Sequence, residues 1–183
     1  MPDLDELVGV FFDFRDELAT FRPVEASAMP EVPRRLLAHH EHMTVTVESH
    51  HRTPVRVDVL QTVVAGDVYA REILLRRTSD DGVVQYGIVR LHMGLLPEDV
   101  QREITARSKP LGRILIDHDV MREVECIALW EVAAGPRLRA LFAMREGEAT
   151  YGRTALIHCG GAPAIELLEI VAPDRSDLAV GEC

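Results

Sequence analysis

From Pro54 onward, apolar and polar residues alternate with a period of two, and this pattern most constrains the fold. The first such segment, 55–60, is typical of a half-buried strand. Five further segments have strand character, at 68–76, 83–91, 123–133, 150–158 and 164–171. Turn sequences at 65–67, 78–82 and 160–161 join several of them directly. Such short connections favour antiparallel neighbours and exclude a series of βαβ crossovers.

Helical segments precede and interrupt these strands. Apolar residues at helical spacing predict an amphipathic helix over 1–22, which a proline-rich connector follows. Further helical segments are expected at 34–51, 96–106 and 136–144. We therefore expect an α+β fold with about six antiparallel strands in one sheet. Helices should cover one face of this sheet, and a ligand site should lie between the sheet and the helices.

The expected organisation is one domain with short additions at both ends. Residues 1–33 form an N-terminal helix and connector, residues 34–173 form the main domain, and residues 174–183 form a flexible tail. A chain of 183 residues is long enough for one such domain with a real core.

Composition restricts the partners and the compartment. The formal net charge of −10 argues against nucleic acid, because phosphate binding needs a basic surface. The first residues carry acids instead of a basic leader, and no apolar run is long enough to cross a bilayer, so no membrane partner is expected. Three cysteines without a CxxC motif suit a reducing cytoplasm.

Charged residues inside apolar strands are the first candidates for a site. Arg71 lies in the second predicted strand, and Glu166 and Glu169 lie in the last one. A buried charge is costly unless it is paired or used. The two glutamates are an odd number of residues apart, so strand alternation puts them on opposite faces. The pattern fits a ligand site, a structural Arg–Glu pair across the sheet, or a glutamate that faces solvent.

Histidines offer a weaker hypothesis. His39 and His42 have helical i, i+3 spacing, which allows two imidazoles to share a cation. The HExxH pattern is absent from the sequence, and so are a glycine-rich phosphate loop and a GxSxG motif. A polar helix face beside a pocket is the simpler interpretation, and we expect no metal ion and no cofactor.

Five short motifs occur in an order and spacing that can be compared with a known family. They are RRLLAHHEHM at 34–43, Arg71-Glu-Ile-Leu-Leu75, Lys109-Pro-Leu-Gly-Arg113, Tyr151-Gly-Arg153, and the run from Gly161-Ala-Pro163 to Glu169-Ile-Val-Ala-Pro173. Over residues 34–173 this ordered set resembles the chorismate lyase family. The resemblance implies six antiparallel strands with helical flaps over a buried aromatic ligand. It also implies that chorismate is split to 4-hydroxybenzoate and pyruvate without a cofactor.

The resemblance assigns a role to each matched residue. Arg71 corresponds to the arginine that holds the ligand carboxylate, a task for which a bidentate guanidinium is suited. Leu111 corresponds to a leucine whose backbone contacts the carboxylate end, and Met43 to a flap methionine. Glu169 corresponds to the acid at the hydroxyl end, which when protonated donates to the departing ether oxygen. Arg153 corresponds to the first arginine of a family pair.

Departures from the family pattern concern the second carboxylate of chorismate. Where the family has Gly-Arg-Thr, this chain has Gly87-Ile88-Val89, and Arg90 is the shifted candidate for that carboxylate. The approach to Glu169 is one residue longer than usual, so Glu166 is an alternative acid.

Three functions are compatible with this resemblance. The first is a chorismate lyase, and the second is a related enzyme that acts on another aromatic or enol-ether acid. The third is a non-catalytic protein that binds an aromatic or polyketide-like molecule. The same fold serves as the effector-binding domain of some bacterial transcription regulators, whose DNA-binding domain we do not expect in this acidic chain. In each case the expected partner is a small anionic aromatic ligand.

Overall fold

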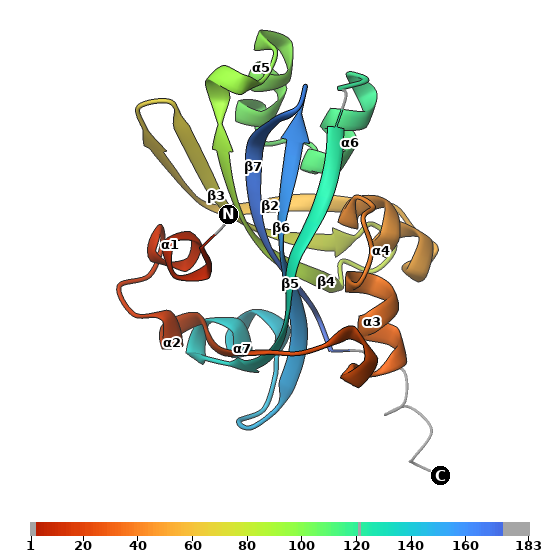
Figure 1. Cartoon of the computed structure of the whole chain (residues 1–183). Coiled ribbons are helices and arrows are strands. Elements are labelled where there is room, and N and C mark those ends of the chain that lie inside the picture. The colour runs from red at the N-terminus through yellow and green to blue at the C-terminus, as the bar shows by residue number, and fades with distance from the viewer. Residues whose placement is uncertain (1–2, 121, 174–183) are drawn as a thin grey trace.

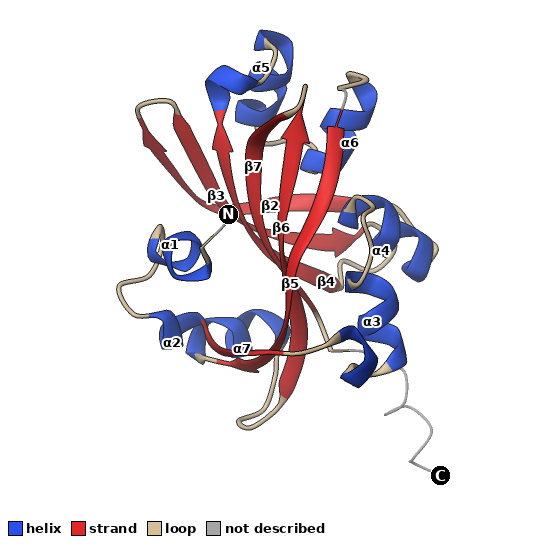
Figure 2. Ribbon diagram, viewed as in Figure 1, coloured by secondary structure: helices blue, strands red, loops and turns tan. Residues whose placement is uncertain are grey.

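Seven strands form one antiparallel sheet in the computed structural model, which describes residues 3–120 and 122–173 (Figures 1 and 2). The strand order is β1-β5-β6-β7-β4-β3-β2, and the sheet is strongly twisted. The strands are β1 (Ala19–Pro23), β2 (Val55–Ala65), β3 (Val68–Arg77), β4 (Val83–His92), β5 (Arg122–Ala134), β6 (Ala149–Cys159) and β7 (Ala162–Val171). The predicted α+β class with a single antiparallel sheet is therefore confirmed, and all six expected strands are present.

The seventh strand, β1, occupies a segment that the apolar periodicity assigned to a helix. Two short helices, α1 (Leu4–Gly9) and α2 (Arg15–Leu18), precede it, and the backbone then becomes extended at Ala19. β1 pairs with β5 and buries Phe21 against the core. The single helix expected over 1–22 is thus wrong: it is interrupted between Gly9 and Arg15, and its C-terminal end is a strand, because pairing with a distant strand outweighs a weak local preference.

Helices cover both faces of the sheet instead of one. Helices α1, α2 and α7 (Pro136–Phe142) pack on one side, which we call the α7 face. Helices α3 (Glu31–Leu37), α4 (Met43–His51), α5 (Glu98–Ala106) and α6 (Leu111–Asp117) pack on the other side, the α4–α6 face. Short 3-10 helices lie at Ala26–Ala28 and Met93–Leu95. Successive residues of a strand point to opposite faces, so Ile73 belongs to one apolar cluster and Leu74 to the other.

The helical region expected at 34–51 is divided by a bend. Helix α3 ends at Leu37, and α4 begins only at Met43. The valines and threonines of α4 have low helix propensity, yet its buried face packs on the sheet and keeps it helical. The tail predicted to be flexible, 174–183, lies outside the described residues. In the ranges that are described, no helix has the length and apolar character needed to cross a bilayer.

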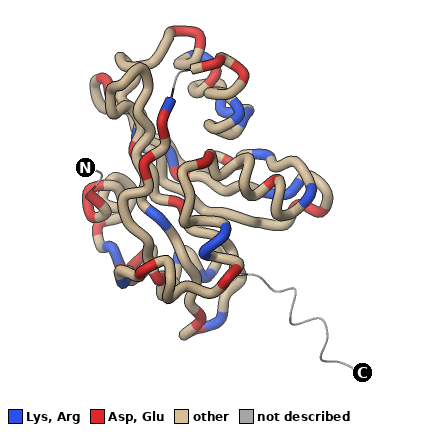
Figure 3. Tube along the Cα trace, turned by 45° about the vertical axis from the view of Figure 1, so that its right-hand side comes forward, with Lys and Arg blue, Asp and Glu red and all other residues tan. Residues whose placement is uncertain are grey.

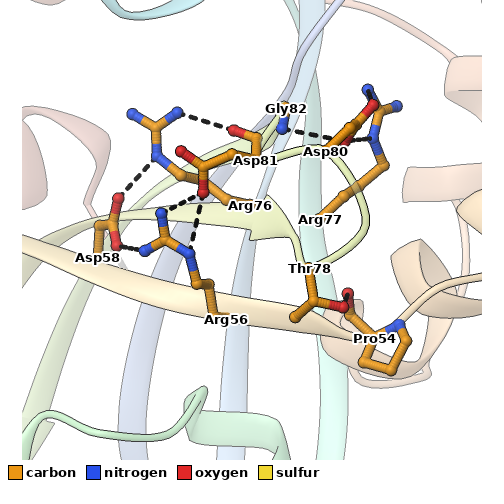
Figure 4. Close-up of polar contacts among 9 residues, drawn as sticks. All are labelled: Pro54, Arg56, Asp58, Arg76, Arg77, Thr78, Asp80, Asp81 and Gly82. Carbon is orange, nitrogen blue, oxygen red and sulfur yellow. Dashed lines mark hydrogen bonds and ion pairs between the residues drawn. The ribbon is translucent and has the colours of Figure 1, made fainter.

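The turn between β3 and β4 is tied to β2 by surface charges (Figure 4). Arg76 Nε donates to Asp58 Oδ2 at 2.7 Å, and its Nη1 donates to the carbonyl of Asp81 at 3.0 Å. Arg56 donates to the carboxylates of both Asp58 and Asp81. These groups are partly exposed, so solvent screening leaves each pair only a small contribution to stability. Together they fix the turn that the sequence predicted at 78–82.

A buried carboxylate holds α7 to the sheet. Glu72 of β3 is fully buried on the α7 face. Arg137 donates to it from Nε at 3.1 Å and from Nη2 at 2.8 Å. The hydroxyl of Tyr86 and the amide of Gln61 donate to the same carboxylate at 3.1 and 3.0 Å. Four donors therefore satisfy this charge, and half of them come from α7.

We predict that Arg137→Met destabilises the protein by about 2–3 kcal/mol, because it leaves the buried Glu72 carboxylate without its counter-charge. Denaturant unfolding followed by circular dichroism measures the change. Arg139→Met on the same helix is the matched control and should change stability by less than about 0.5 kcal/mol. Equal effects of the two variants would show that the pair with Glu72 is unimportant.

Candidate functional site

A small cavity lies between the sheet and the first turns of α4 and α6. Met43 and Thr44 line it from α4, and Leu111 and Gly112 line it from α6. Its volume is ≈ 30 Å³, about enough for one water molecule. The two helices touch above it, because a Cβ atom on Gly112 would lie 2.8 Å from Thr44 Oγ1. A ligand of the size of an aromatic ring therefore requires α4 and α6 to separate.

Most of the residues that the resemblance singled out meet at this cavity. Met43, Leu111, Arg153 and Glu169 line it. Arg71 lies at the border of the cavity. Its side chain is on the same face of β3 as the lining residue Ile73, and across the ladder it pairs with Val89, which also lines the cavity. The structure thus brings together side chains from β3, β6, β7, α4 and α6 that are far apart in the sequence.

Arg71 is fully buried and has no counter-ion among the described residues. All three nitrogens of its guanidinium lack a hydrogen-bond partner in that part of the chain. Burial lowers the pKa of Arg71 below its ordinary value, and the interaction with Tyr69 opposes this shift. An arginine nevertheless keeps its charge at neutral pH. A buried charge in this state destabilises the fold, and an anion bound in the cavity would compensate it.

Arg153 is equally buried, but its charge is already paired with a carboxylate. Its Nε donates to Glu169 Oε2 at 2.7 Å. Its Nη1 donates to the carbonyls of His39 at 2.8 Å and Leu37 at 3.4 Å, and its Nη2 donates to that of Glu41 at 3.1 Å. These carbonyls belong to the end of α3 and the bend between α3 and α4, where the regular helical hydrogen bonds stop, and that of Leu37 also accepts from the amide of His39. Arg153 and Glu169 therefore form a structural pair that holds the bend leading into the cavity.

Arg90 and Glu166 lie on the α7 face. The Nε atom of Arg90 donates to Glu166, and its Nη2 donates to Glu6 Oε2 at 3.1 Å. Neither residue lines the cavity. The expectation that Arg90 binds a second carboxylate is wrong, because position 90 is an odd number of residues from the cavity-lining Val89. Glu166 cannot replace Glu169 for the same reason, and the predicted separation of the two glutamates on opposite faces is confirmed.

The histidines have partners of their own. His42 lines the cavity, and its Nε2 accepts a hydrogen bond from Arg122 Nε at 2.5 Å. Burial lowers the pKa of His42 to about 4, and the charges of Arg122 and Arg153 act in the same direction. His39 Nε2 lies 2.6 Å from the carbonyl of Leu36. Within residues 3–120 and 122–173, no three His, Cys, Asp or Glu side chains converge as metal ligands.

Two polar residues of the cavity region were missed by the sequence reasoning. Tyr69 precedes Arg71 by two residues, and Gln85 precedes Gly87 by two residues, so both share the face of the cavity. Each is buried with a side-chain oxygen that has no partner in the described part of the chain. Strand alternation around Arg71 would have identified Tyr69, whereas placing Gln85 required the register between β3 and β4.

Comparison with known proteins supports the fold. No family model matches the sequence, and no curated protein matches it significantly. PhnF from Mycobacterium smegmatis aligns with a TM-score of 0.56 and 12% identity over 81% of this chain and 70% of that chain. The structure of the effector domain of PhnF aligns with a TM-score of 0.55 and 12% identity, over 74% of this chain and 90% of that chain. Identity at this level bears on the fold alone, which is chorismate lyase-like.

We predict that Arg71→Met stabilises the ligand-free protein by about 1–4 kcal/mol, because an apolar side chain of similar length replaces an unpaired buried charge. Denaturant unfolding in a buffer without carboxylates or phosphate measures the change. Arg76→Met, on the same strand but at the surface, should alter stability by less than about 1 kcal/mol. A marked loss of stability in Arg71→Met would mean that the guanidinium has a structural role.

We predict that His42 makes stability depend on pH between about 6.5 and 4. The folded state resists protonation of this imidazole and the unfolded state does not, so stability is retained above pH 6.5. It is lost as the pH falls towards 4, where His42 also protonates in the folded state. His42→Gln should flatten this part of the stability profile measured by urea unfolding. An unchanged profile would show that other groups cause the loss.

Proposed function

We propose that this chain is a non-catalytic domain that binds one small aromatic anion through Arg71. The observation that carries the proposal is the fully buried guanidinium without a partner among the described residues. A carboxylate fits it because two parallel N–H···O bonds form in one plane. Ile73 and Val89 from the sheet, with Leu111 and Met43 from the helices, supply apolar surface for a ring.

Chorismate lyase activity has less support than binding. Chorismate carries two carboxylates, whereas Arg153 is committed to Glu169 and Arg90 lies on the other face. Elimination also needs a proton donor beside the ether oxygen. Glu169 acts as an acceptor for Arg153, so it would have to break this pair to serve as an acid. The need for a proton donor argues equally against a related enzyme that acts on another enol-ether acid.

The wider charge distribution suits a small ligand better than a polyanion. Positive and negative residues are interspersed along the trace (Figure 3), and many arginines pair with acids. Examples are Arg15 with Asp5, Arg77 with Asp80, and Arg113 with Glu48. With a net charge of −10 the surface repels anions, so a local buried cation has to provide the attraction. The absence of a nucleic-acid partner and a cytoplasmic location stay predictions.

The likeness to an effector domain also supports a binding role. The chain shares its fold with the effector domain of PhnF, and we propose that it likewise responds to an effector molecule. In such a role the ligand changes the populations of two conformations and no bond is broken. We propose that this change is a separation of α4 and α6, because the cavity between them and the sheet is too small for an aromatic ring.

We expect 4-hydroxybenzoate to bind the wild-type protein and to lose at least about 100-fold in affinity in Arg71→Met, because two charge-assisted hydrogen bonds disappear. Isothermal titration calorimetry measures both affinities. Arg76→Met removes a surface arginine from the same strand and should bind like the wild type. Equal binding by Arg71→Met would overturn the proposed anchor.

The catalytic alternative is tested in the same preparation. Chorismate mixed with a stoichiometric amount of protein should release no pyruvate above the uncatalysed rate, as followed with a coupled dehydrogenase assay. Release of one equivalent of pyruvate would overturn the non-catalytic part of the proposal and leave the role of Arg71 intact.

A further inference from the structure

Three buried side chains on one face of the sheet have polar atoms without a partner in the described ranges. They are the hydroxyl of Tyr69, the guanidinium of Arg71 and the side-chain carbonyl oxygen of Gln85. Other buried charges of the sheet are satisfied, as in the pair of Arg153 with Glu169 and the contacts of Glu72. Unsatisfied buried polar atoms are costly, so their concentration beside one cavity points to a bound molecule that completes them.

Of the three residues, Gln85 lines the cavity, whereas Tyr69 and Arg71 lie at its border on the same face of the sheet. Tyr69 and Arg71 are neighbours on one face of β3. Gln85 lines the cavity and pairs across the ladder with Leu75, which is four residues further along β3 than Arg71. Four residues of an extended strand span about 13 Å at roughly 3.3 Å per residue. The sheet therefore presents a cationic group at the border of the cavity and a second polar group, Gln85, inside it.

Between these two places the lining residues of β3 and β4 are apolar, and Glu169 of β7 is paired with Gly87 on its other side. Ile73 of β3 and Gly87 of β4 are directly paired there, and both line the cavity. A Cβ atom on Gly87 would lie 3.2 Å from Ile73 Cγ1, so a larger residue would fill the space next to Ile73. A planar ring can lie across this glycine with one substituent towards Arg71 and another towards Gln85.

The Arg71 end and the Gln85 end of this face differ in chemistry. A guanidinium only donates hydrogen bonds, and a tyrosine hydroxyl can donate as well, so this end suits an anion. The free oxygen of Gln85 only accepts, so the opposite end suits a neutral donor such as a hydroxyl or an amine. Among the described residues Arg153 is the arginine that lines the cavity, and Glu169 already neutralises it, so Arg71 at the border is left to hold one anionic group.

We infer that Gln85 is a specificity-determining residue that selects aromatic monocarboxylates with a hydrogen-bond donor at the end remote from the carboxylate. The inference rests on the proposed function, because it assumes that Arg71 holds the carboxylate. It goes further by assigning recognition of the remote donor to Gln85, whose oxygen is free. Glu169, which is bound to Arg153, is the competing acceptor near that end.

Calorimetry with two matched pairs of acids tests the inference. The pairs are benzoate with 4-hydroxybenzoate, and cinnamate with the longer 4-hydroxycinnamate. In at least one pair, the wild type should bind the hydroxylated acid about fivefold or more tightly, as expected for one added hydrogen bond. In Gln85→Leu, the affinity for the hydroxylated acid should fall to the affinity for the acid of the same pair that lacks the hydroxyl. Gln61→Leu, the same change on another strand, should keep the preference.

The outcomes separate the two proposals. If the acids of each pair bind equally to the wild type but Arg71→Met abolishes binding, the inference fails and the proposed function stands. If the preference persists in Gln85→Leu, recognition belongs to Glu169, and the inference fails. If no acid binds in an Arg71-dependent way, both fail.

Thermal unfolding provides a test that needs no ligand. Gln85→Leu removes a buried oxygen that lacks a partner, so its midpoint in ligand-free buffer should equal or exceed that of the wild type. A clear decrease, reproduced in Gln85→Met, would show that the oxygen is satisfied within the protein and would overturn the inference.

Discussion

The arrangement around the cavity depends on one buried guanidinium, that of Arg153. It joins the central strand pair β6–β7, through Glu169, to the bend between α3 and α4, through three backbone carbonyls. Without these donors the carbonyls of His39 and Glu41 would lose their contact with the sheet, and the start of α4 would lose its position. The position of Met43 above the cavity thus follows from a residue more than a hundred positions further along the chain.

Three buried charged groups in the sheet show how differently the same residue types are used. Glu72 is satisfied by donors from two strands and a helix, and Arg153 by one carboxylate and three carbonyls. Arg71 has neither kind of partner among the described residues. Burial alone is therefore no guide to function. The distinction lies in whether the surrounding protein completes the hydrogen bonds, and this difference is why we propose Arg71 as the ligand anchor.

Much of the fold could be predicted from the sequence because strand alternation and turn residues are local signals. The six strands after Pro54 and the opposite orientation of Glu166 and Glu169 followed from them. The strand β1 could not be predicted, because it exists only through pairing with β5. The resemblance placed Arg71 and Glu169 at the site, but it could not show that Arg153 occupies Glu169. Side-chain pairing across strands depends on register, which no short motif contains.

The contact between Gly112 and Thr44 above the cavity has a consequence for kinetics. If Arg71 is the anchor that we propose, a molecule in solution reaches it only after α4 and α6 part, because the guanidinium is fully buried. The observed rate of association would then rise with ligand concentration only up to a plateau, which equals the rate of spontaneous opening. The same barrier slows escape, so residence can be long even where the equilibrium affinity is modest.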